Sequence, residues 1–348
     1  MSAIDADAHV IETEATFEYL DPELEKHRPW VTVMKGNDVT IRGLEGNLQK
    51  EFWVIDGRLY PKEGNIGFNT TKESREMENI QSRLDHMDEL EIDVQVLYPT
   101  VFLRPVTADP WVEYALCKSY NRWMAEIWKA APDRLKWVVM PPLLMMDKCE
   151  EELRWAKKHG AVGVFLRGAE CNIQADNPYF FRLYKLGEEL DLPMCFHSGN
   201  GSLNLYEIYK PGGLARGKLP VVAACSQLLL SEIPAMFPKL RWAFIEVSAQ
   251  WIPYVLNDVS LRILRKGKRL SPTHLADNNM FVACQVTDDL EYVLGYAGEG
   301  QLVVGTDYGH ADTSTEIMAM RRLQDEGKVP RAVVDKILVD NAKVLYGL

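Results

Sequence analysis

The chain opens with Ala3-Ile4-Asp5-Ala6-Asp7-Ala8-His9-Val10, a short apolar run that carries an acidic residue and a histidine near its end. Side chains two residues apart on a β-strand point to the same face, so Asp7 and His9 would face the same way. A buried charge is costly unless it is paired or bound to a metal. The stretch therefore predicts a buried strand that presents Asp7 and His9 together at its carboxyl end. Asp5 shares their face but lies deeper.

Three later apolar runs end on residues of the same kind, namely His197, Glu246 and Asp307. Imidazoles and carboxylates are common ligands of divalent metals. A (β/α)8 barrel collects its functional residues at the carboxyl ends of its strands. The joint pattern predicts a metal site that these three residues share with Asp7 and His9. Taken singly, His197 could be a core histidine and Asp307 a helix N-cap.

Strand-like and helix-like segments alternate eight times, which is typical of an α/β protein with a parallel sheet. The strands are short, rich in Val, Ile and Phe, and not alternating, as expected when both faces are buried. We predict a (β/α)8 TIM barrel in one domain, residues 1–348. The expected strands are Ala3–His9, Val94–Tyr98, Trp137–Met140, Val162–Leu166, Pro193–His197, Arg241–Glu246, Met280–Cys284 and Leu302–Thr306. The expected helices are Glu76–Glu91, Pro110–Ala131, Lys148–His159, Pro178–Leu190, Pro220–Met236, Trp251–Arg265, Asp288–Ala297, Ser314–Glu326 and Pro330–Tyr346.

Two stretches interrupt the alternation, residues 30–76 after the first strand and Ser198–Leu219 after the fifth. We predict that residues 30–76 form a small antiparallel insertion. Its expected strands are Trp30–Lys35, Asp38–Ile41 and Phe52–Tyr60, with turns at Gly36-Asn37 and Asp56-Gly57. Both stretches follow barrel strands, so they would emerge on the active face. Each is either a lid or specificity element, or a packing flap or subunit contact.

Composition excludes several classes of partner. The 348 residues are 47% apolar and carry a net charge of -11, with a pI near 5.3. Nucleic acid and anionic membranes both bind basic patches, so neither is expected. No apolar stretch approaches the ~20 residues of a membrane span. The expected partner is a small-molecule substrate.

The six cysteines are scattered, with no CxxC pair, and no secretion signal precedes them. We therefore expect reduced thiols in a cytoplasmic protein. A homodimer is expected from the general habit of barrel enzymes rather than from any residue.

Four motifs, taken in order, resemble the amidohydrolase-related family, the branch of the amidohydrolase superfamily that also holds the aminocarboxymuconate-semialdehyde and resorcylate-type decarboxylases. They are Asp5-Ala6-Asp7-Ala8-His9-Val10-Ile11-Glu12, Arg83-Leu84-Asp85-His86-Met87-Asp88-Glu89-Leu90-Glu91-Ile92-Asp93, Phe196-His197-Ser198-Gly199 and Gly305-Thr306-Asp307-Tyr308-Gly309-His310. The resemblance covers essentially the whole chain. It implies that Asp7, His9 and His197 are metal ligands. It also implies that Asp307 is both a ligand and the base that handles the proton of the metal-bound water.

The sequence departs from that family's pattern in two places. The first residue of the strand-1 pair is Asp7 rather than histidine, as in the acidic-x-His subgroup. Strand 6 often brings a histidine, but no histidine lies between His197 and His274, and Glu246 stands near that place. Glu246 could bind the ion, hold its water or pair with an arginine.

The expected cofactor is one divalent ion per chain, Zn, Fe or Mn, which can lower the pKa of a bound water toward ~7. Asp307 would act first as general base and then as general acid. His310 could donate to the oxyanion, or it could be an exposed loop histidine. Arg104 and Arg167 could each bind a substrate carboxylate or pair with a structural acid.

Three functions remain open from the sequence. The first is hydrolysis of an ester, thioester, amide or lactone of a small apolar or aromatic carboxylic-acid derivative. The second is non-oxidative decarboxylation of an aromatic or enoic acid, which the resemblance also implies. The absent strand-6 histidine favours hydrolysis, because decarboxylases of this kind commonly carry it. The third is a metal-free barrel that serves as a binding protein.

Overall fold

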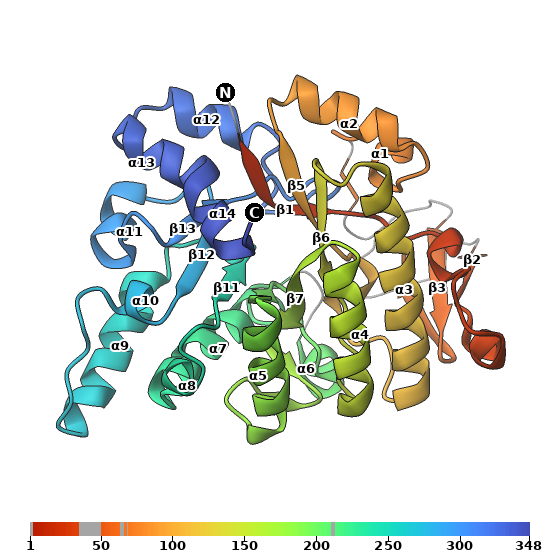
Figure 1. The fold of residues 1–348 in the computed structure, drawn as a ribbon, viewed down its shortest axis with the longest axis horizontal. Helices are drawn as coiled ribbons and strands as arrows, with labels where there is room; N and C mark the ends of the chain where they lie inside the picture. The colour runs from red at the N-terminus through yellow and green to blue at the C-terminus, as the bar shows by residue number, and fades with distance from the viewer. Residues whose placement is uncertain (1–2, 35–49, 63–65, 68, 210–212) are drawn as a thin grey trace.

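Eight parallel strands form the centre of the protein in a computed structural model, which describes residues 3–34, 50–62, 66–67, 69–209 and 213–348 (Figure 1). Neighbouring strands follow the order β1-β5-β6-β7-β10-β11-β12-β13. This arrangement confirms the predicted (β/α)8 barrel. The strands are β1 (Ile4–His9), β5 (Val94–Tyr98), β6 (Leu135–Val139), β7 (Ala161–Arg167), β10 (Met194–His197), β11 (Trp242–Ile245), β12 (Met280–Cys284) and β13 (Leu302–Val304).

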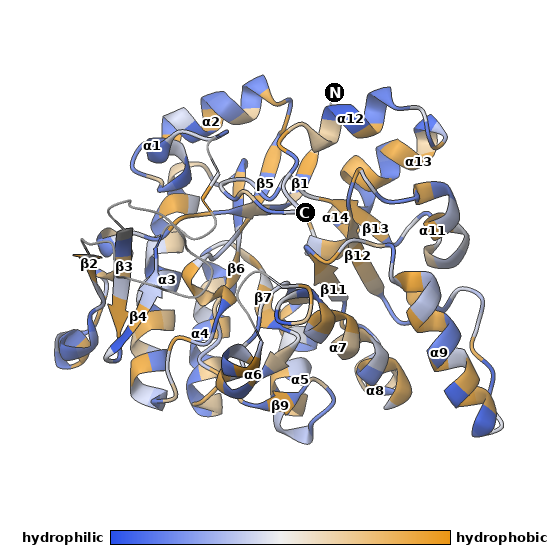
Figure 2. Ribbon diagram, turned by 180° about the vertical axis from the view of Figure 1, so that it is seen from behind, coloured by the Kyte–Doolittle hydropathy of each residue, from blue (hydrophilic) through white to orange (hydrophobic). Residues whose placement is uncertain are grey.

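Helices surround the strands and turn their apolar sides inward, as the colouring by hydropathy shows (Figure 2). The C-terminal helix is tied to the barrel, because the Tyr346 hydroxyl donates a hydrogen bond to the Ala6 carbonyl at 2.8 Å. The longer helices are α2 (Ile80–Glu89), α3 (Pro110–Ala130), α4 (Met146–Lys158), α5 (Phe181–Leu190), α7 (Lys218–Leu230), α9 (Ile252–Arg265) and α11 (Leu290–Ala297). The chain ends with α12 (Ala319–Asp325), α13 (Arg331–Asp335), a π-helical turn (Lys336–Asp340) and α14 (Asn341–Tyr346).

Several predicted boundaries are wrong, and three of them have a clear local reason. The first long helix begins at Ile80 rather than Glu76, because Met77 has a left-handed φ of 57° and the Asn79 side chain caps the helix. The helix expected over residues 220–236 splits into α7 and α8 (Ile233–Met236) at Glu232, whose φ is 55°. The last strand stops at Val304, before the chain turns at Asp307.

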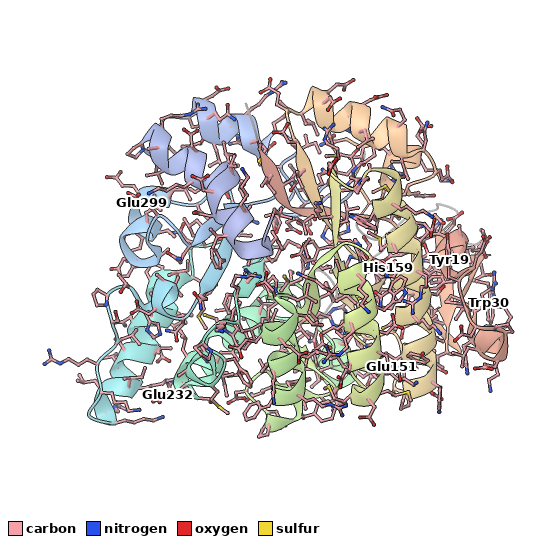
Figure 3. The ribbon with its side chains drawn as sticks, in the orientation of Figure 1. Tyr19, Trp30, Glu151, His159, Glu232 and Glu299 are labelled. Carbon is pink, nitrogen blue, oxygen red and sulfur yellow. The ribbon has the colours of Figure 1, made fainter. Side chains whose placement is uncertain are left out.

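The insertion after β1 is an antiparallel sheet of β2 (Trp30–Met34), β3 (Lys50–Ile55) and β4 (Arg58–Pro61). The turn predicted at Asp56-Gly57 is present, with both residues at positive φ. The Gly36-Asn37 turn and the Asp38–Ile41 strand lie outside the described residues. Trp30 projects from this sheet at the edge of the molecule, and it is 54% exposed (Figure 3).

The Ser198–Leu219 stretch contains a short helix, α6 (Leu203–Ile208), in its described part. All six cysteines are free, and five of them are buried. No helix among the described residues is both long and apolar enough to cross a membrane.

The barrel closes where β13 meets β1. The Asp307 N–H donates to the Asp7 carbonyl at 2.9 Å, and the His9 N–H donates to the Tyr308 carbonyl at 3.0 Å. A Cβ added at Gly305 would lie 2.2 Å from Cβ of Asp7, so no side chain fits there. The closure therefore depends on glycine at residue 305, and it brings Asp7 and Asp307 side by side.

We predict that Gly305→Ala lowers the free energy of unfolding by about 1–3 kcal/mol, because the added methyl group forces the two strands apart. Urea unfolding in the presence of a chelator would measure the change without a contribution from bound ions. The matched control is Gly295→Ala in α11, where nothing lies within 4 Å of an added Cβ. Equal stability of the two variants would show that the seam is not closely packed.

Candidate metal centre

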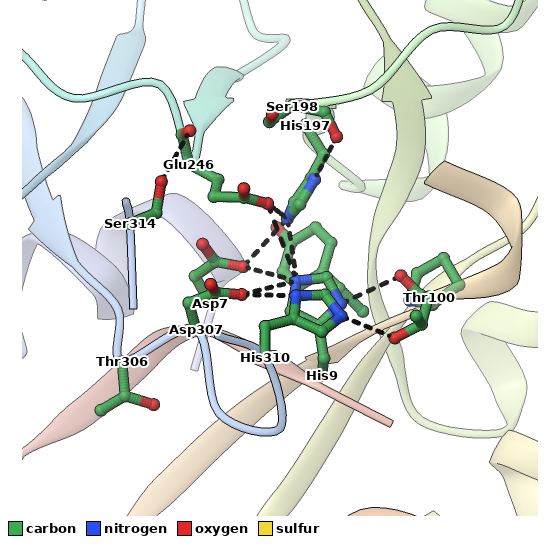
Figure 4. A network of polar contacts seen from close by, with 12 residues as sticks. Asp7, His9, Thr100, His197, Ser198, Glu246, Thr306, Asp307, His310 and Ser314 are labelled. Atoms are coloured by element: carbon green, nitrogen blue, oxygen red, sulfur yellow. Dashed lines mark hydrogen bonds and ion pairs between the residues drawn. The ribbon is translucent and has the colours of Figure 1, made fainter. Parts of the chain in front are cut away.

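Five buried side chains converge at the carboxyl ends of four strands (Figure 4). Asp7 and His9 come from β1, His197 ends β10, Glu246 follows β11, and Asp307 follows β13. The structure thus brings together all five residues that the sequence placed at strand ends. Ligand atoms of Asp7, His9, His197 and Glu246 lie within 4.8 Å of one another, and so do those of a second group, His9, Glu246, Asp307 and His310. Each group is compact enough to share a metal ion.

The two imidazoles face each other across this cluster. Nε2 of His9 lies 3.2 Å from Nε2 of His197, and Nε2 of His197 lies 3.1 Å from Oδ1 of Asp7. Oε2 of Glu246 is 3.3 Å from Nε2 of His197, and Oδ1 of Asp307 is 3.4 Å from Nε2 of His9. Three carboxylates and two imidazoles therefore point at one small volume.

Hydrogen bonds at the far side of each ring fix which nitrogen carries the proton. Nδ1 of His9 donates to the Pro99 carbonyl at 3.0 Å, and Nδ1 of His197 donates to the Ser198 carbonyl at 2.8 Å. A carbonyl only accepts, so each neutral ring carries its proton on Nδ1 and leaves the Nε2 lone pair free. Backbone acceptors behind the ring are the usual support of a metal-bound histidine.

Two lone pairs that face each other at 3.2 Å repel unless a cation lies between them. Burial lowers the pKa of His9 well below its usual value, and the nearby His310 and His197 lower it further, so protonation of His9 does not remove the repulsion. The residues present therefore fit a divalent metal. The assignment of Asp7, His9, His197 and Asp307 as its ligands stays a prediction.

Glu246 is the fifth member of the cluster. Its Oε2 is buried and has no hydrogen-bond partner in the described structure. Burial, followed by the negative charge of Asp307, raises the pKa of Glu246 well above its usual value. Its backbone has a left-handed φ of 60°, a costly conformation that often marks a functional site. A cation at the cluster would satisfy this oxygen, so the geometry favours metal or water binding over a pairing with arginine.

Asp307 is held by two side chains besides the cluster. Nδ1 of His310 lies 2.7 Å from Oδ1 of Asp307, and the Thr315 hydroxyl donates to Oδ2 at 2.6 Å. Burial raises the pKa of Asp307 to about 6, although the adjacent His310 lowers it in part. Asp307 also has a left-handed φ of 54°, which turns its carboxylate into the cluster.

His310 is buried, so the alternative of an exposed loop histidine is wrong. The Thr100 hydroxyl donates to the Val10 carbonyl at 2.7 Å and therefore accepts from Nε2 of His310 at 2.9 Å. Both ring nitrogens are engaged, and the ring points at Asp307 rather than at open space. Burial alone would lower the pKa of His310, but the Asp307 carboxylate raises it above its usual value.

The two predicted arginines differ in their surroundings. Arg167 forms a bidentate pair with Glu170, at 2.8 and 2.6 Å, and its Nη1 donates to the carbonyls of Phe102 and Arg104. This is the structural pairing that the sequence left open. Arg104 donates from Nη1 to the Pro61 carbonyl at 3.3 Å and forms no ion pair with any described carboxylate. Substrate binding by either arginine stays a prediction.

Sequence reasoning missed the hydrogen-bonded residues that surround Asp5, next to the cluster. Asp5 accepts from the backbone N–H and the hydroxyl of Thr306 at 2.9 and 2.6 Å, and from Nε2 of Gln95 at 3.0 Å. Gln95 in turn accepts from Nε of the buried Arg83 at 2.6 Å. Arg83 is part of a quoted motif, but only the fold shows that it contacts β5. Thr100 and Thr315 carried no signal of their own.

The profile of the family described as Amidohydrolase matches residues 4–348. The fold is similar to that of an amidohydrolase from Mycobacterium avium subsp. paratuberculosis K-10, at 18% identity over 99% of this chain and 98% of that one, with a TM-score of 0.76. No curated protein matches the sequence.

Two further solved structures share the fold. One is a 2,6-dihydroxybenzoate decarboxylase from Rhizobium, at 17% identity over 99% of this chain and 98% of that one, with a TM-score of 0.63. The other is a 4-oxalomesaconate hydratase from Rhodopseudomonas palustris, at 16% identity over 99% and 95% of the two chains, with a TM-score of 0.65.

We predict that the purified protein binds about one Zn, Fe or Mn ion per chain, and that His197→Ala weakens metal affinity at least ~10-fold, because a ligand is lost. Elemental mass spectrometry after dialysis against each ion would measure it. His27→Ala is the control, because His27 lies in a short helical turn (Pro22–His27) and is no member of the cluster. Equal metal content in wild type and His197→Ala would contradict the site.

Proposed function

The chain belongs to the amidohydrolase family, and we propose that it is a metal-dependent hydrolase that uses water to cleave an ester, thioester, amide or lactone. The substrate would be a small, apolar or aromatic carboxylic-acid derivative. The observation that carries this proposal is the position of Asp307. Its Oδ1 lies 3.4 Å from Nε2 of His9 at the cluster and 2.7 Å from Nδ1 of His310 behind it.

A bound divalent ion would polarise the carbonyl group and lower the pKa of a water molecule. Two imidazoles and up to three carboxylates suit Zn, Fe or Mn. Asp7, His9, His197 and Asp307 would hold the ion, and Glu246 would either join them or fix the water. Oε2 of Glu246 is available for either role, because it has no hydrogen-bond partner in the described structure and faces Nε2 of His197 at 3.3 Å.

Asp307 would remove the proton from the attacking water and return it to the leaving group, acting as base and then as acid. His310 would keep the carboxylate of Asp307 in place, since Thr100 holds the other side of its ring at 2.9 Å. This differs from direct donation to the oxyanion, which the engaged ring nitrogens of His310 disfavour. The Thr315 hydroxyl would fix the second oxygen of Asp307 at 2.6 Å.

Decarboxylation of an aromatic or enoic acid is the second candidate, because the fold is similar to that of a 2,6-dihydroxybenzoate decarboxylase. In that reaction the Asp307–His310 pair would deliver a proton to carbon instead of handling the proton of water. Glu246 stands after β11, where the decarboxylases of the resembled branch commonly carry a histidine. This difference is why we place hydrolysis first. A binding protein without metal is disfavoured, because the imidazole and carboxylate side chains that meet at the cluster are typical metal ligands.

We predict that Asp307→Asn lowers kcat by about 10²–10⁴-fold, because general acid–base catalysis typically contributes that much. The metal-loaded enzyme would be assayed on aryl esters, thioesters, lactones and hydroxybenzoates, with acid release and carbon dioxide release followed separately. Asp85→Asn on the exposed side of α2 is the control.

Carbon dioxide release without acid release would replace hydrolysis with decarboxylation. Full activity of Asp307→Asn on a hydrolysed substrate would remove Asp307 from the role of base. In that case Glu246, the other carboxylate at the cluster, would be tested next as Glu246→Gln.

A further inference from the structure

Two arginines near the mouth of the barrel make no ion pair with any carboxylate in the described structure. They are Arg104, in the loop after β5, and Arg216, just before α7. Each is half-buried. Arg104 has one hydrogen bond, to the Pro61 carbonyl at 3.3 Å, and the Arg216 guanidinium lies over the Tyr206 ring at 3.7 Å. In a chain of net charge -11, half-buried arginines without an acid are unusual enough to need an explanation.

The backbone places both arginines beside the segment that leaves the metal ligand His197. The Asn200 N–H donates to the Leu103 carbonyl at 3.0 Å, and the Gly199 N–H donates to the Gly217 carbonyl at 3.2 Å. Arg104 follows Leu103, and Arg216 precedes Gly217. The two arginines therefore flank residues 199–200, two to three residues beyond His197.

Close packing holds this arrangement in place. A Cβ added at Gly199, whose φ is 146°, would lie 2.5 Å from the Leu103 carbonyl oxygen. A Cβ added at Gly217 would lie 3.1 Å from Oγ of Ser198. The three segments are thus closely packed, and their hydrogen bonds fix the loops that carry the arginines relative to the strand that carries His197.

The two positive charges also act on each other. Burial lowers the pKa of Arg216, the Tyr206 hydroxyl opposes this change, and the charge of Arg104 adds to the lowering. A bound anion would offset both the cost of burying the Arg216 charge and the repulsion between the two arginines. The guanidinium plane matches a carboxylate, with two parallel N–H donors for its two oxygens.

Two tyrosines lie near Arg104 and Arg216. The Tyr206 ring lies against the guanidinium of Arg216. Tyr60, on β4, contacts the loop that carries Arg104, because its hydroxyl donates to the Val106 carbonyl at 3.1 Å. Arg58 at the tip of the β3–β4 turn is already matched by Glu207, with the two charges 3.9 Å apart. Among the described residues, Arg104 and Arg216 form no ion pair, and Arg216 lies against the Tyr206 ring.

We propose that Arg104 and Arg216 together bind a carboxylate of the substrate that is separate from the bond that reacts. This inference rests on the proposed function, and it narrows the substrate to a planar molecule that bears an anionic group. Arg167, in contrast, takes no part, because Glu170 already neutralises it. The arginines would act in binding and orientation, not in the transfer of protons.

Equilibrium binding of two simple probes tests this proposal without any need for turnover. Benzoate and benzamide have the same shape but differ in charge, and their affinities for the metal-loaded protein would be measured by calorimetry. We expect Arg104→Met and Arg216→Met each to weaken benzoate binding at least ~10-fold, as for the loss of a charge-assisted contact, and to leave benzamide within twofold. Arg216→Lys should restore part of the affinity, because it keeps the charge but not the planar fork.

Arg262→Met is the matched control, since Arg262 lies on α9 and pairs with Asp258 at 2.7 Å. Metal content and thermal unfolding of each variant would show that the fold and the metal site are intact. Benzoate affinity that is unchanged in both arginine variants would overturn the proposal. An equal loss for benzamide would also overturn it, because the arginines would then shape the pocket rather than bind charge.

The experiments distinguish failure of this inference from failure of the hydrolase proposal. If no ester or thioester is cleaved but benzoate binding still requires both arginines, the anion site is supported and hydrolysis is not the reaction. If hydrolysis is found and benzoate binds without the arginines, the anion site alone fails. With a cleaved substrate that carries a carboxylate, the same variants should raise KM at least ~10-fold and change kcat little, since binding and not chemistry is lost.

Discussion

The contact between β13 and β1 is the constraint on which the rest of the site depends. Gly305 lets the two strands approach until no Cβ fits between them, and the backbone of Asp307 then bonds to Asp7. Asp5 completes the seam, because its carboxylate accepts from both the N–H and the hydroxyl of Thr306. The first and last strands of the barrel are in this way joined at the level where both carry a carboxylate. Closure of the barrel therefore also brings together two carboxylates of the candidate metal centre, Asp7 and Asp307.

This closure gathers several ionisable groups in one buried volume. The cluster holds the side chains of three acidic residues and two histidines, and burial raises the pKa of the Asp307 carboxyl to about 6. Glu246 and Asp307 also occupy left-handed backbone conformations, at φ of 60° and 54°. Such conformations cost of order 1–3 kcal/mol each and persist where surrounding contacts hold them. A divalent ion would offset the repulsion, so its binding energy would also stabilise the fold.

The sequence predicted the strands and their polar ends because both are local properties. A strand buried on both faces is apolar throughout, so a histidine or carboxylate at its end stands out, as at His9 and His197. Helix starts were harder to predict, because the left-handed turn at Met77 and the split at Glu232 depend on how the chain packs. The support by Arg83 and Gln95 could not be seen in advance either. They lie on a helix and a strand, and only the barrel brings them beside Asp5.

The partners of the two predicted arginines, Arg104 and Arg167, could not be predicted from the sequence either. Arg167 and Glu170 are three residues apart, and the tight hairpin of β8 (Ala169–Glu170) and β9 (Ile173–Gln174) turns the acid back onto the arginine. Arg104 has no acid at such a distance among the described residues, so its charge stays available. An acidic protein repels an anion at long range, and only a local cationic site can then admit an anionic substrate. Whether an arginine binds a structural acid or a ligand is therefore decided by the nearest carboxylate in space, which the fold determines.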